Sequence, residues 1–133
     1  MNREHVTTWL AGYERAWRTA GSDPLRELFS EDASYSQGPY ETPVTGLPAI
    51  ARMWDETRDG NDEVFAMTSD IVAIDGDTAV VRVQVQYGDP VSQEYRDLWI
   101  MTFAEDGRCK AYEEWPYWPG KPYTADKSTD PAR

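Results

Sequence analysis

Up to Phe29, apolar residues recur at three- and four-residue intervals, which is the spacing of an amphipathic helix. Asn2 can cap a first helix, and Gly21 is expected to end it. The apolar stripe of this helix consists of Val6, Trp9, Leu10, Tyr13, Trp17 and Ala20. Ser22, with Pro24 two residues later, opens a short second helix. The apolar positions of the second helix are Leu25, Leu28 and Phe29.

The next segment combines a short strand, a loop and a third helix. Residues 33–36 are typical of a short strand, and residues 37–44 contain one glycine and two prolines, which predicts a loop. Pro48 suits the first turn of the third helix, and Gly60 is expected to end it. The apolar stripe of the third helix consists of Leu47, Ile50, Ala51 and Trp54.

After Gly60 the helical spacing gives way to alternation of apolar and polar residues, which is typical of strands. We expect strands over residues 64–74 and 78–87, joined by a hairpin turn at Asp75-Gly76. The segment Gly88-Asp89-Pro90 breaks the pattern, and two further strands follow within residues 94–118.

The register of the last two strands decides which carboxylates face inward. A two-residue turn at Asp106-Gly107 would pair Trp99 with Glu114. One face would then carry Asp97, Trp99, Met101, Tyr112 and Glu114, and the other Leu98, Ile100, Thr102, Ala111, Glu113 and Trp115. A three-residue loop with a bulge at Gly107 would shift the register by one residue and turn Glu113 and Trp115 inward. The sequence leaves both registers open.

Helices followed by a meander of long antiparallel strands predict an α+β domain. Because strands of ten or more residues twist and curl, we expect a cone-shaped, curved antiparallel sheet. Three helices from the N-terminal half should lie over its concave face and leave a pocket inside. The domain is expected to span residues 1–118. Residues 119–133 contain three prolines and few apolar groups, which predicts a mobile C-terminal tail.

Composition narrows the classes of partner. The 133 residues carry a formal net charge of −11, so we expect neither nucleic acid nor an anionic membrane as a partner. No stretch approaches the ~20 apolar residues of a membrane span, and the N-terminus lacks the pattern of a signal peptide. Cys109 is the single cysteine, which fits a reducing compartment and predicts a cytoplasmic protein. Six Trp and eight Tyr suit an aromatic pocket or an oligomer interface.

The sequence predicts no metal and no cofactor. His5 is the only histidine, and no run of Asp and Glu has the spacing of a calcium loop. The sequence also contains no glycine-rich phosphate loop, no nucleophile elbow and no dinucleotide fingerprint.

Asp97 is the carboxylate that we expect to transfer a proton. It lies two residues before Trp99 and therefore faces the same way, on a strand that should be half buried. Burial against aromatic rings raises the pKa of a carboxyl group and suits general acid or base catalysis. The alternative is an ion pair with Arg82 or Arg96 at the mouth of the cone.

Glu114 and Tyr13 complete the expected catalytic group. Glu114 lies diagonal to Asp97 in the first register, where two carboxyl groups would push their pKa values apart. Tyr13 can donate a hydrogen bond to a ligand oxygen from the first helix. The alternatives are an exposed glutamate and a core tyrosine. The other residues expected to bind the ligand are Trp17, Tyr35, Gln37, Trp54, Trp99, Met101 and Tyr112.

Four segments, in this order, resemble the nuclear transport factor 2-like superfamily. They are YERAWRTAGSDPLRELFSEDASY, GLPAIARMW, IDGDTAVVRVQV and DLWIMTFAEDGR, and with their spacers they cover residues 6–118. The superfamily includes ketosteroid isomerase, the SnoaL-like polyketide cyclases, scytalone dehydratase and limonene epoxide hydrolase. The resemblance implies the cone fold, and the fold alone does not choose among these activities.

The resemblance to ketosteroid isomerase can be followed residue by residue. Tyr13 falls where that family has its oxyanion-hole tyrosine, and Trp99 falls where it has the protonated aspartate of the oxyanion hole. Gln37 falls where it has the aspartate that moves the proton. Because a glutamine cannot act as a base at neutral pH, the resemblance does not extend to the isomerase mechanism.

We therefore expect a small-molecule pocket protein with cofactor-free acid–base chemistry, as an isomerase, dehydratase, cyclase or epoxide hydrolase. Its substrate would be compact and apolar, with a carbonyl or hydroxyl group. The alternatives are a non-catalytic ligand-binding or protein-association module of the same fold, and a partner subunit held by its exposed sheet. The apolar face around Leu98 and Ile100 predicts a homodimer packed sheet on sheet, as the superfamily resemblance also implies.

Overall fold

Three helices lie in the first half of the chain, as the apolar spacing predicts. The structure is a computed structural model that describes residues 1–58 and 63–120. Its helices are α1 (Arg3–Trp17), α2 (Leu25–Leu28) and α3 (Leu47–Thr57). Asn2 caps α1 as predicted, because its side-chain oxygen accepts a hydrogen bond from the backbone N–H of His5 at 2.8 Å.

α1 is shorter than its apolar stripe predicts. It ends at Trp17 instead of near Gly21, and Ala20 is exposed beyond the helix. The carbonyl oxygens of Trp17, Thr19 and Gly21 accept hydrogen bonds from the guanidinium of Arg58. These bonds satisfy carbonyl groups at and beyond the C-terminus of α1, where no intrahelical N–H is available.

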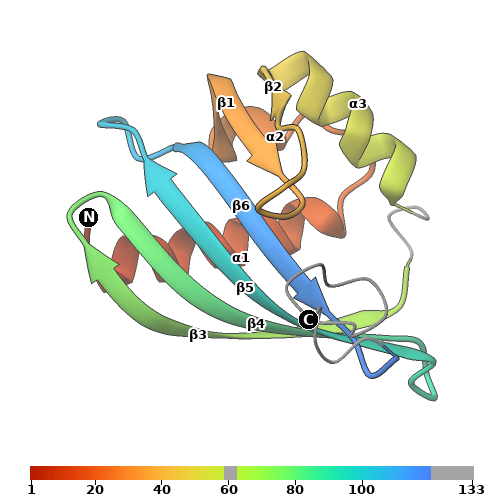
Figure 1. Cartoon of the computed structure of the whole chain (residues 1–133). Coiled ribbons are helices and arrows are strands. Elements are labelled where there is room, and N and C mark those ends of the chain that lie inside the picture. Colours follow the sequence, from red (N-terminus) through yellow and green to blue (C-terminus); the bar gives the residue numbers. More distant parts are fainter. Residues whose placement is uncertain (59–62, 121–133) are drawn as a thin grey trace, which may run out of the picture.

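Six strands form one curved, unclosed sheet. They are β1 (Phe29–Ser36), β2 (Val44–Thr45), β3 (Phe65–Asp75), β4 (Thr78–Tyr87), β5 (Gln93–Phe103) and β6 (Cys109–Tyr117). The strand order is β2-β1-β6-β5-β4-β3, and α1 runs along one face of the sheet (Figure 1). This arrangement confirms the predicted α+β cone.

The sheet contains one parallel pair that the sequence pattern does not predict. β1 pairs with β6 in parallel, whereas the other neighbouring strands pair antiparallel. Phe29, expected in the second helix, instead begins β1, because it is fully buried and pairs with Cys109 of β6. β1 is therefore longer than the strand predicted over residues 33–36.

The turn of the final hairpin differs from the two-residue prediction. The backbone N–H of Ala104 donates to the carbonyl of Arg108 at 2.8 Å, which leaves a three-residue loop between them. Gly107 has a positive φ of 89° in this loop, a conformation that strains any residue with a side chain. A Cβ at this position would also lie 2.6 Å from Cε1 of His5. The loop therefore requires glycine here.

A bulge restores the register beyond the loop. The pairing of β5 with β6 shifts between Thr102 and Phe103, which makes Lys110 the extra residue of β6. Trp99 consequently pairs with Glu114, as in the first of the two predicted registers. The loop is thus the three-residue alternative, but the bulge offsets its extra residue, so the faces of the hairpin are those expected for the two-residue turn.

The core lies between α1 and the concave face of the sheet. The inward-facing side chains of β4 and β5 that α1 covers are Ala79, Val81, Val83, Trp99, Met101 and Phe103, all buried. Trp9 of α1 packs against Phe29 and Phe103, with ring centroids 5.6 and 5.9 Å apart. Its indole N–H donates to the Leu28 carbonyl at 2.8 Å, so the ring is buried without an unsatisfied polar atom.

The convex face of the sheet is half exposed along the last two strands. Its side chains there are the predicted set of Leu98, Ile100, Thr102, Ala111, Glu113 and Trp115. The homodimer that we expect through this face stays a prediction.

Two sequence predictions fall on residues that the structure does not describe. α3 ends at Thr57, and Gly60, its predicted end, lies outside the described residues. Residues 121–133 of the predicted tail also lie outside them. In the described part of the chain, no helix is both long and apolar enough to cross a bilayer.

Candidate functional site

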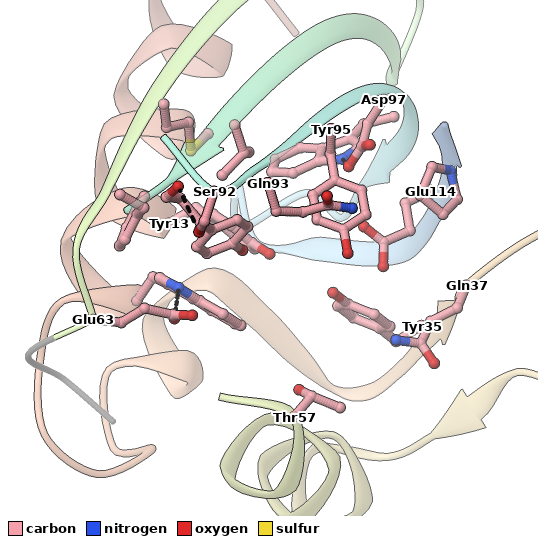
Figure 2. Close-up of a pocket in the computed structure, with 17 residues that line it drawn as sticks. Tyr13, Tyr35, Gln37, Thr57, Glu63, Ser92, Gln93, Tyr95, Asp97 and Glu114 are labelled. Atoms are coloured by element: carbon pink, nitrogen blue, oxygen red, sulfur yellow. Dashed lines mark hydrogen bonds between the residues drawn. The ribbon is translucent and has the colours of Figure 1, made fainter. Parts of the chain in front are cut away.

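A cavity of about 550 Å³ opens at one end of the concave face. Side chains from α1, α3 and β1, and from the adjoining ends of β3, β4, β5 and β6, surround it (Figure 2). Its volume falls in the range that is typical of sites for small organic molecules. The cavity is thus where the fold could hold a ligand.

Strand alternation brings two carboxylates into this cavity. Asp97 and Trp99 lie two residues apart on β5 and share the concave face, and Glu114 pairs with Trp99 across the ladder to β6. Asp97 and Glu114 are therefore diagonal neighbours on adjacent strands, and both line the cavity. Tyr13 lines the same cavity from α1. The three residues expected to be catalytic thus meet in one place.

Asp97 is an acid held among apolar groups. The residue is only 8% exposed, and Oδ2 accepts a hydrogen bond from the indole N–H of Trp99 at 3.3 Å. Burial raises the pKa of Asp97 from its usual 3.8 to about 6, although hydrogen bonds from Trp99 and the Tyr117 backbone favour the charged form. A carboxyl group with this pKa exchanges its proton near neutral pH.

The described residues do not show the alternative ion pair of Asp97 with Arg82 or Arg96. Arg82 lies 3.8 Å from Asp70, and Arg96 lies 4.0 Å from Glu94. Both arginine side chains are largely exposed. Among the described ion pairs, therefore, neither arginine neutralises Asp97.

Glu114 is the second acid with a raised pKa. Burial, followed by the negative charge of Asp97, raises the pKa of Glu114 from its usual 4.5 to about 7. Hydrogen bonds from Tyr112 and Gln37 partly offset this rise. The Tyr112 hydroxyl donates to Oε2 of Glu114 at 3.3 Å. The two carboxyl groups therefore differ in pKa and influence each other.

A cluster of three tyrosines lies beneath Glu114. Tyr35 and Tyr112 stack with centroids 4.3 Å apart, and Tyr13 stacks on Tyr112 at 6.3 Å. Burial, followed by the charge of Glu114, raises the pKa of each of the three hydroxyls. The hydroxyls therefore remain protonated at physiological pH and can act only as neutral hydrogen-bonding groups.

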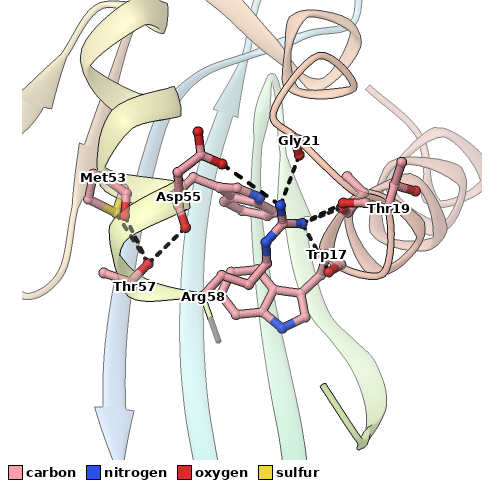
Figure 3. A network of polar contacts seen from close by, with 9 residues as sticks. Trp17, Thr19, Gly21, Met53, Asp55, Thr57 and Arg58 are labelled. Atoms are coloured by element: carbon pink, nitrogen blue, oxygen red, sulfur yellow. Dashed lines mark hydrogen bonds and ion pairs between the residues drawn. The ribbon is translucent and has the colours of Figure 1, made fainter. Parts of the chain in front are cut away.

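Arg58 fixes the helical side of the cavity mouth. Its guanidinium, on a side chain only 5% exposed, donates to the carbonyl oxygens of Ala16 and Trp17 at 3.1 Å and reaches two more carbonyls after α1 (Figure 3). Asp55 on α3 lies 3.8 Å from the same group. Arg58 follows α3 directly, so it ties the end of α3 to the end of α1. Trp17 and Thr57, which line the cavity, lie at these two ends.

The structure divides the expected ligand-binding residues into two groups. Trp17, Tyr35, Gln37 and Trp99 line the cavity. Trp54, Met101 and Tyr112 are fully buried in the core and do not appear in the lining. Tyr112 nevertheless contacts Glu114 from below, so it supports the site without facing the cavity.

The sequence reasoning missed most of the mouth of the cavity. The polar residues that it missed are Thr57, Glu63, Tyr87, Ser92, Gln93 and Tyr95. Tyr87 and Tyr95 could have been found, because both continue an alternation that places Val85 and Asp97 on the concave face. Glu63 and Ser92 lie outside strands, where no periodicity indicates a direction. The cavity is consequently more polar than the sequence suggests.

In the described residues, no three His, Cys, Asp or Glu side chains come together in a group that could hold a metal ion. His5 lies near the hairpin loop, where its Nε2 is 2.7 Å from the carbonyl oxygen of Gly107. Cys109 is fully buried, and burial raises the pKa of its thiol to about 12. Neither side chain lines the cavity.

The chain matches one family of known proteins and resembles several solved structures. Residues 10–112 match the family described as SnoaL-like domain. A candidate polyketide cyclase from Sinorhizobium meliloti is 25% identical with a TM-score of 0.62, and the match covers 81% of this chain and 94% of that one. A candidate ketosteroid isomerase from Kribbella flavida is 20% identical with a TM-score of 0.63, covering 92% and 83%.

A third structure is described as an epoxide hydrolase/cyclase-like enzyme with a role in pyran ring formation in the polyether salinomycin. It is 15% identical with a TM-score of 0.66, covering 89% of this chain and 94% of that one. No curated protein matches the sequence. The two structures at 20% and 15% identity carry the fold alone.

Proposed function

Since the chain belongs to the SnoaL-like domain family, we propose that its cavity performs cofactor-free acid–base chemistry on a small organic molecule. The reaction class is isomerisation, dehydration, cyclisation or epoxide opening, on a compact substrate with a carbonyl or hydroxyl group. The descriptions of the similar structures as cyclase, isomerase and epoxide hydrolase/cyclase-like enzyme support this class.

One observation carries the proposal: two carboxyl groups with raised but unequal pKa values share one cavity. Asp97, whose pKa burial raises to about 6, serves as the base. Glu114, whose pKa is raised to about 7 by burial and then by the charge of Asp97, serves as the acid. Groups whose environments push their pKa values apart are suited to opposite roles in one reaction.

Tyr13 is assigned to the substrate oxygen. Its hydroxyl is buried on the cavity side of α1 and stays protonated, because burial and the charge of Glu114 raise its pKa. Its ring lies 4.7 Å from that of Trp99, which restricts its position. A fixed, neutral donor of this kind stabilises the negative charge that develops on a carbonyl or hydroxyl oxygen.

Gln37 distinguishes this site from that of ketosteroid isomerase. It falls at the base position of that enzyme, and its amide interacts with Glu114. An amide cannot accept the proton, so the base role passes to Asp97 on β5. The proposed function therefore uses the same cavity with a different base.

The test begins with a substrate screen over small ketones, enones, epoxides and polyketide-like aromatics, read as thermal stabilisation and then as turnover. With a substrate in hand, kcat/KM should rise with pH through about 6 and fall through about 7. Asp97→Asn should lower kcat by about 10²–10⁴-fold. Asp70→Asn removes an exposed carboxylate and should leave kcat unchanged.

Two results would contradict the proposal. One is unchanged turnover in Asp97→Asn. The other is binding without turnover across every class of compound, which would instead favour a ligand-binding module with the same cavity.

A further inference from the structure

Each of the two carboxyl groups assigned to catalysis accepts a hydrogen bond from an aromatic side chain of its own strand. On β5 the indole N–H of Trp99 donates to Oδ2 of Asp97 at 3.3 Å. On β6 the hydroxyl of Tyr112 donates to Oε2 of Glu114 at 3.3 Å. In both pairs the donor and the acid are two residues apart, so they share the concave face. Strand alternation therefore supplies each acid with a donor of its own.

Packing holds both donors in place. Trp99 is 2% exposed and Tyr112 is 1% exposed, and their ring centroids lie 5.2 Å apart. The ring of Tyr13 lies 4.7 Å from that of Trp99, and Tyr35 stacks on Tyr112 at 4.3 Å. Because neighbouring rings enclose both donors, the N–H and O–H groups have little freedom to turn away. Each donor can therefore restrict the orientation of the carboxyl group that it contacts.

Both hydrogen bonds favour the charged form of the acid, because a carboxylate accepts a hydrogen bond more strongly than a neutral carboxyl group does. Burial raises the pKa of Asp97, and the bonds from Trp99 and from the Tyr117 backbone partly offset this rise. The bond from Tyr112 acts in the same direction on Glu114. Removal of either aromatic donor should therefore raise the pKa of one acid and leave that of the other almost unchanged.

Other ionisable side chains also face the two acids. Those in the described lining are Tyr13 of α1, Tyr35 of β1, Glu63 before β3, Tyr87 of β4 and Tyr95 of β5. Burial raises the pKa of Tyr13, Tyr35 and Tyr87, so these hydroxyls stay neutral where the acids titrate. Glu63 lies on the side of the cavity opposite Asp97 and Glu114, and its Oε2 accepts a hydrogen bond from Trp17 at 3.0 Å (Figure 2).

We propose that Trp99 and Tyr112 are positioning residues, which hold Asp97 as the base and Glu114 as the acid of the same reaction. Trp99 acts through Asp97, and Tyr112 acts through Glu114. Tyr112 lies outside the lining, so its effect on the reaction does not require contact with the substrate. This inference rests on the proposed function for the two roles, whereas the pairing of each donor with its acid stands on the hydrogen bonds.

Two substitutions should change the pH profile of kcat/KM in opposite ways. Trp99→Phe removes the indole N–H and should raise the pKa of Asp97 by about one pH unit, toward that of Glu114. The rising limb then moves to higher pH, and the bell-shaped profile narrows. Tyr112→Phe removes the hydroxyl and should raise the pKa of Glu114 by a similar amount. The falling limb then moves to higher pH, and the profile widens.

The convex face of β6 offers a matched control. Trp115 donates to Oε2 of Glu113 at 2.7 Å, again across two residues of one strand, but outside the cavity. Trp115→Phe should therefore leave both limbs of the profile unchanged. Tyr112→Phe keeps the ring, so it tests the inference even where Trp99→Phe fails to fold. An equal shift of both limbs in the Trp99 and Tyr112 variants would mean general loosening of the site and would overturn the inference.

A carbon-13 NMR titration of the carboxyl groups in the same variants needs no substrate, so it separates this inference from the proposed function. A raised pKa of Asp97 in Trp99→Phe and of Glu114 in Tyr112→Phe would support the pairing of donors and acids. If Asp97→Asn then left turnover unchanged, the pairing would stand and the acid–base assignment would be refuted. Loss of turnover in Asp97→Asn, with neither pKa moved by the donor variants, would support the proposed function and overturn this inference.

Discussion

The two ends of the concave face are built from the same strands and have opposite characters. Along β5 the inward-facing side chains are, in order, Phe103, Met101, Trp99, Asp97 and Tyr95. At the first end α1 closes over the sheet, and Trp9 packs against Phe103. At the second end α1 has finished at Trp17, and the cavity opens.

The difference shows that strand alternation and helix cover determine separate properties of the site. Alternation decides that Met101 and Asp97 face the same way. The extent of α1 decides which side chain each position can hold. Met101 lies under α1 and is fully buried and apolar, whereas Asp97 lies beyond α1 and is an acid beside the cavity. Asp97 is buried enough to raise its pKa and near enough to the cavity to transfer a proton.

The closed end should lose the most stability when it is altered. Met101→Ala removes a fully buried side chain from between α1 and the sheet, and should lower the free energy of unfolding by about 2–5 kcal/mol. Ile100→Ala, on the half-exposed convex face of the same strand, is the matched control and should cost about 1 kcal/mol. Chemical denaturation measures both. Equal losses would contradict the asymmetry between the two faces.

Arg58, which ties the end of α3 to the end of α1 beside the open end, should give the next largest loss of stability. Arg58→Met keeps the apolar stem but removes a donor from four backbone carbonyls, of which, in the described residues, only that of Ala16 keeps a backbone donor, the N–H of Thr19, so the free energy of unfolding should fall by about 2–3 kcal/mol. Arg52 is exposed on the same helix, and Arg52→Met should change stability by less than about 0.5 kcal/mol. Thermal unfolding of the two variants makes the comparison. A tolerated Arg58→Met would mean that solvent satisfies these carbonyls.

At the open end, a substitution of Asp97 should raise the free energy of unfolding instead of lowering it. Because the pKa of Asp97 is raised from 3.8 to about 6, the folded state holds an unfavourable charge above pH 6. The stabilising effect of the neutral acid is complete below about pH 4 and is lost as the pH rises through about 6. Asp97→Asn should therefore stabilise the protein by about 1–3 kcal/mol near pH 8 and have little effect near pH 4.

Chemical denaturation at the two pH values checks this prediction. The pH-matched control is Asp70→Asn, which should change stability little at either pH, because Asp70 is exposed and paired only with exposed Arg82. Destabilisation of Asp97→Asn near pH 8 would mean that the carboxylate makes favourable contacts, and would weaken its assignment as the base.

The comparison also indicates what the sequence could predict. The two faces of β5 and β6 follow from alternation, but the sequence left open which register joins them. Neither the three-residue loop nor the bulge at Lys110 leaves a periodic signal, so the register came from the structure. The parallel pairing of β1 with β6 was not predicted, because it joins segments far apart in the sequence.

The site residues that lie on strands could be predicted from the sequence, whereas those that lie in loops could not. Asp97 and Glu114 follow from alternation once the register is known. Trp54 and Met101 were expected in the pocket but lie in the core, because the sequence does not show where α1 ends its cover. Glu63 lies outside the strands, so its position came from the structure alone.

The most direct test of the central claim is a carbon-13 NMR titration of the carboxyl groups, with assignments from Asp97→Asn and Glu114→Gln. The two groups should titrate with apparent pKa values of about 6 and about 7, and removal of Asp97 should lower the pKa of Glu114. Titration of both groups below about 4.5 would show that they are ordinary solvated carboxylates. That result would contradict the division of acid and base roles on which the proposed function rests.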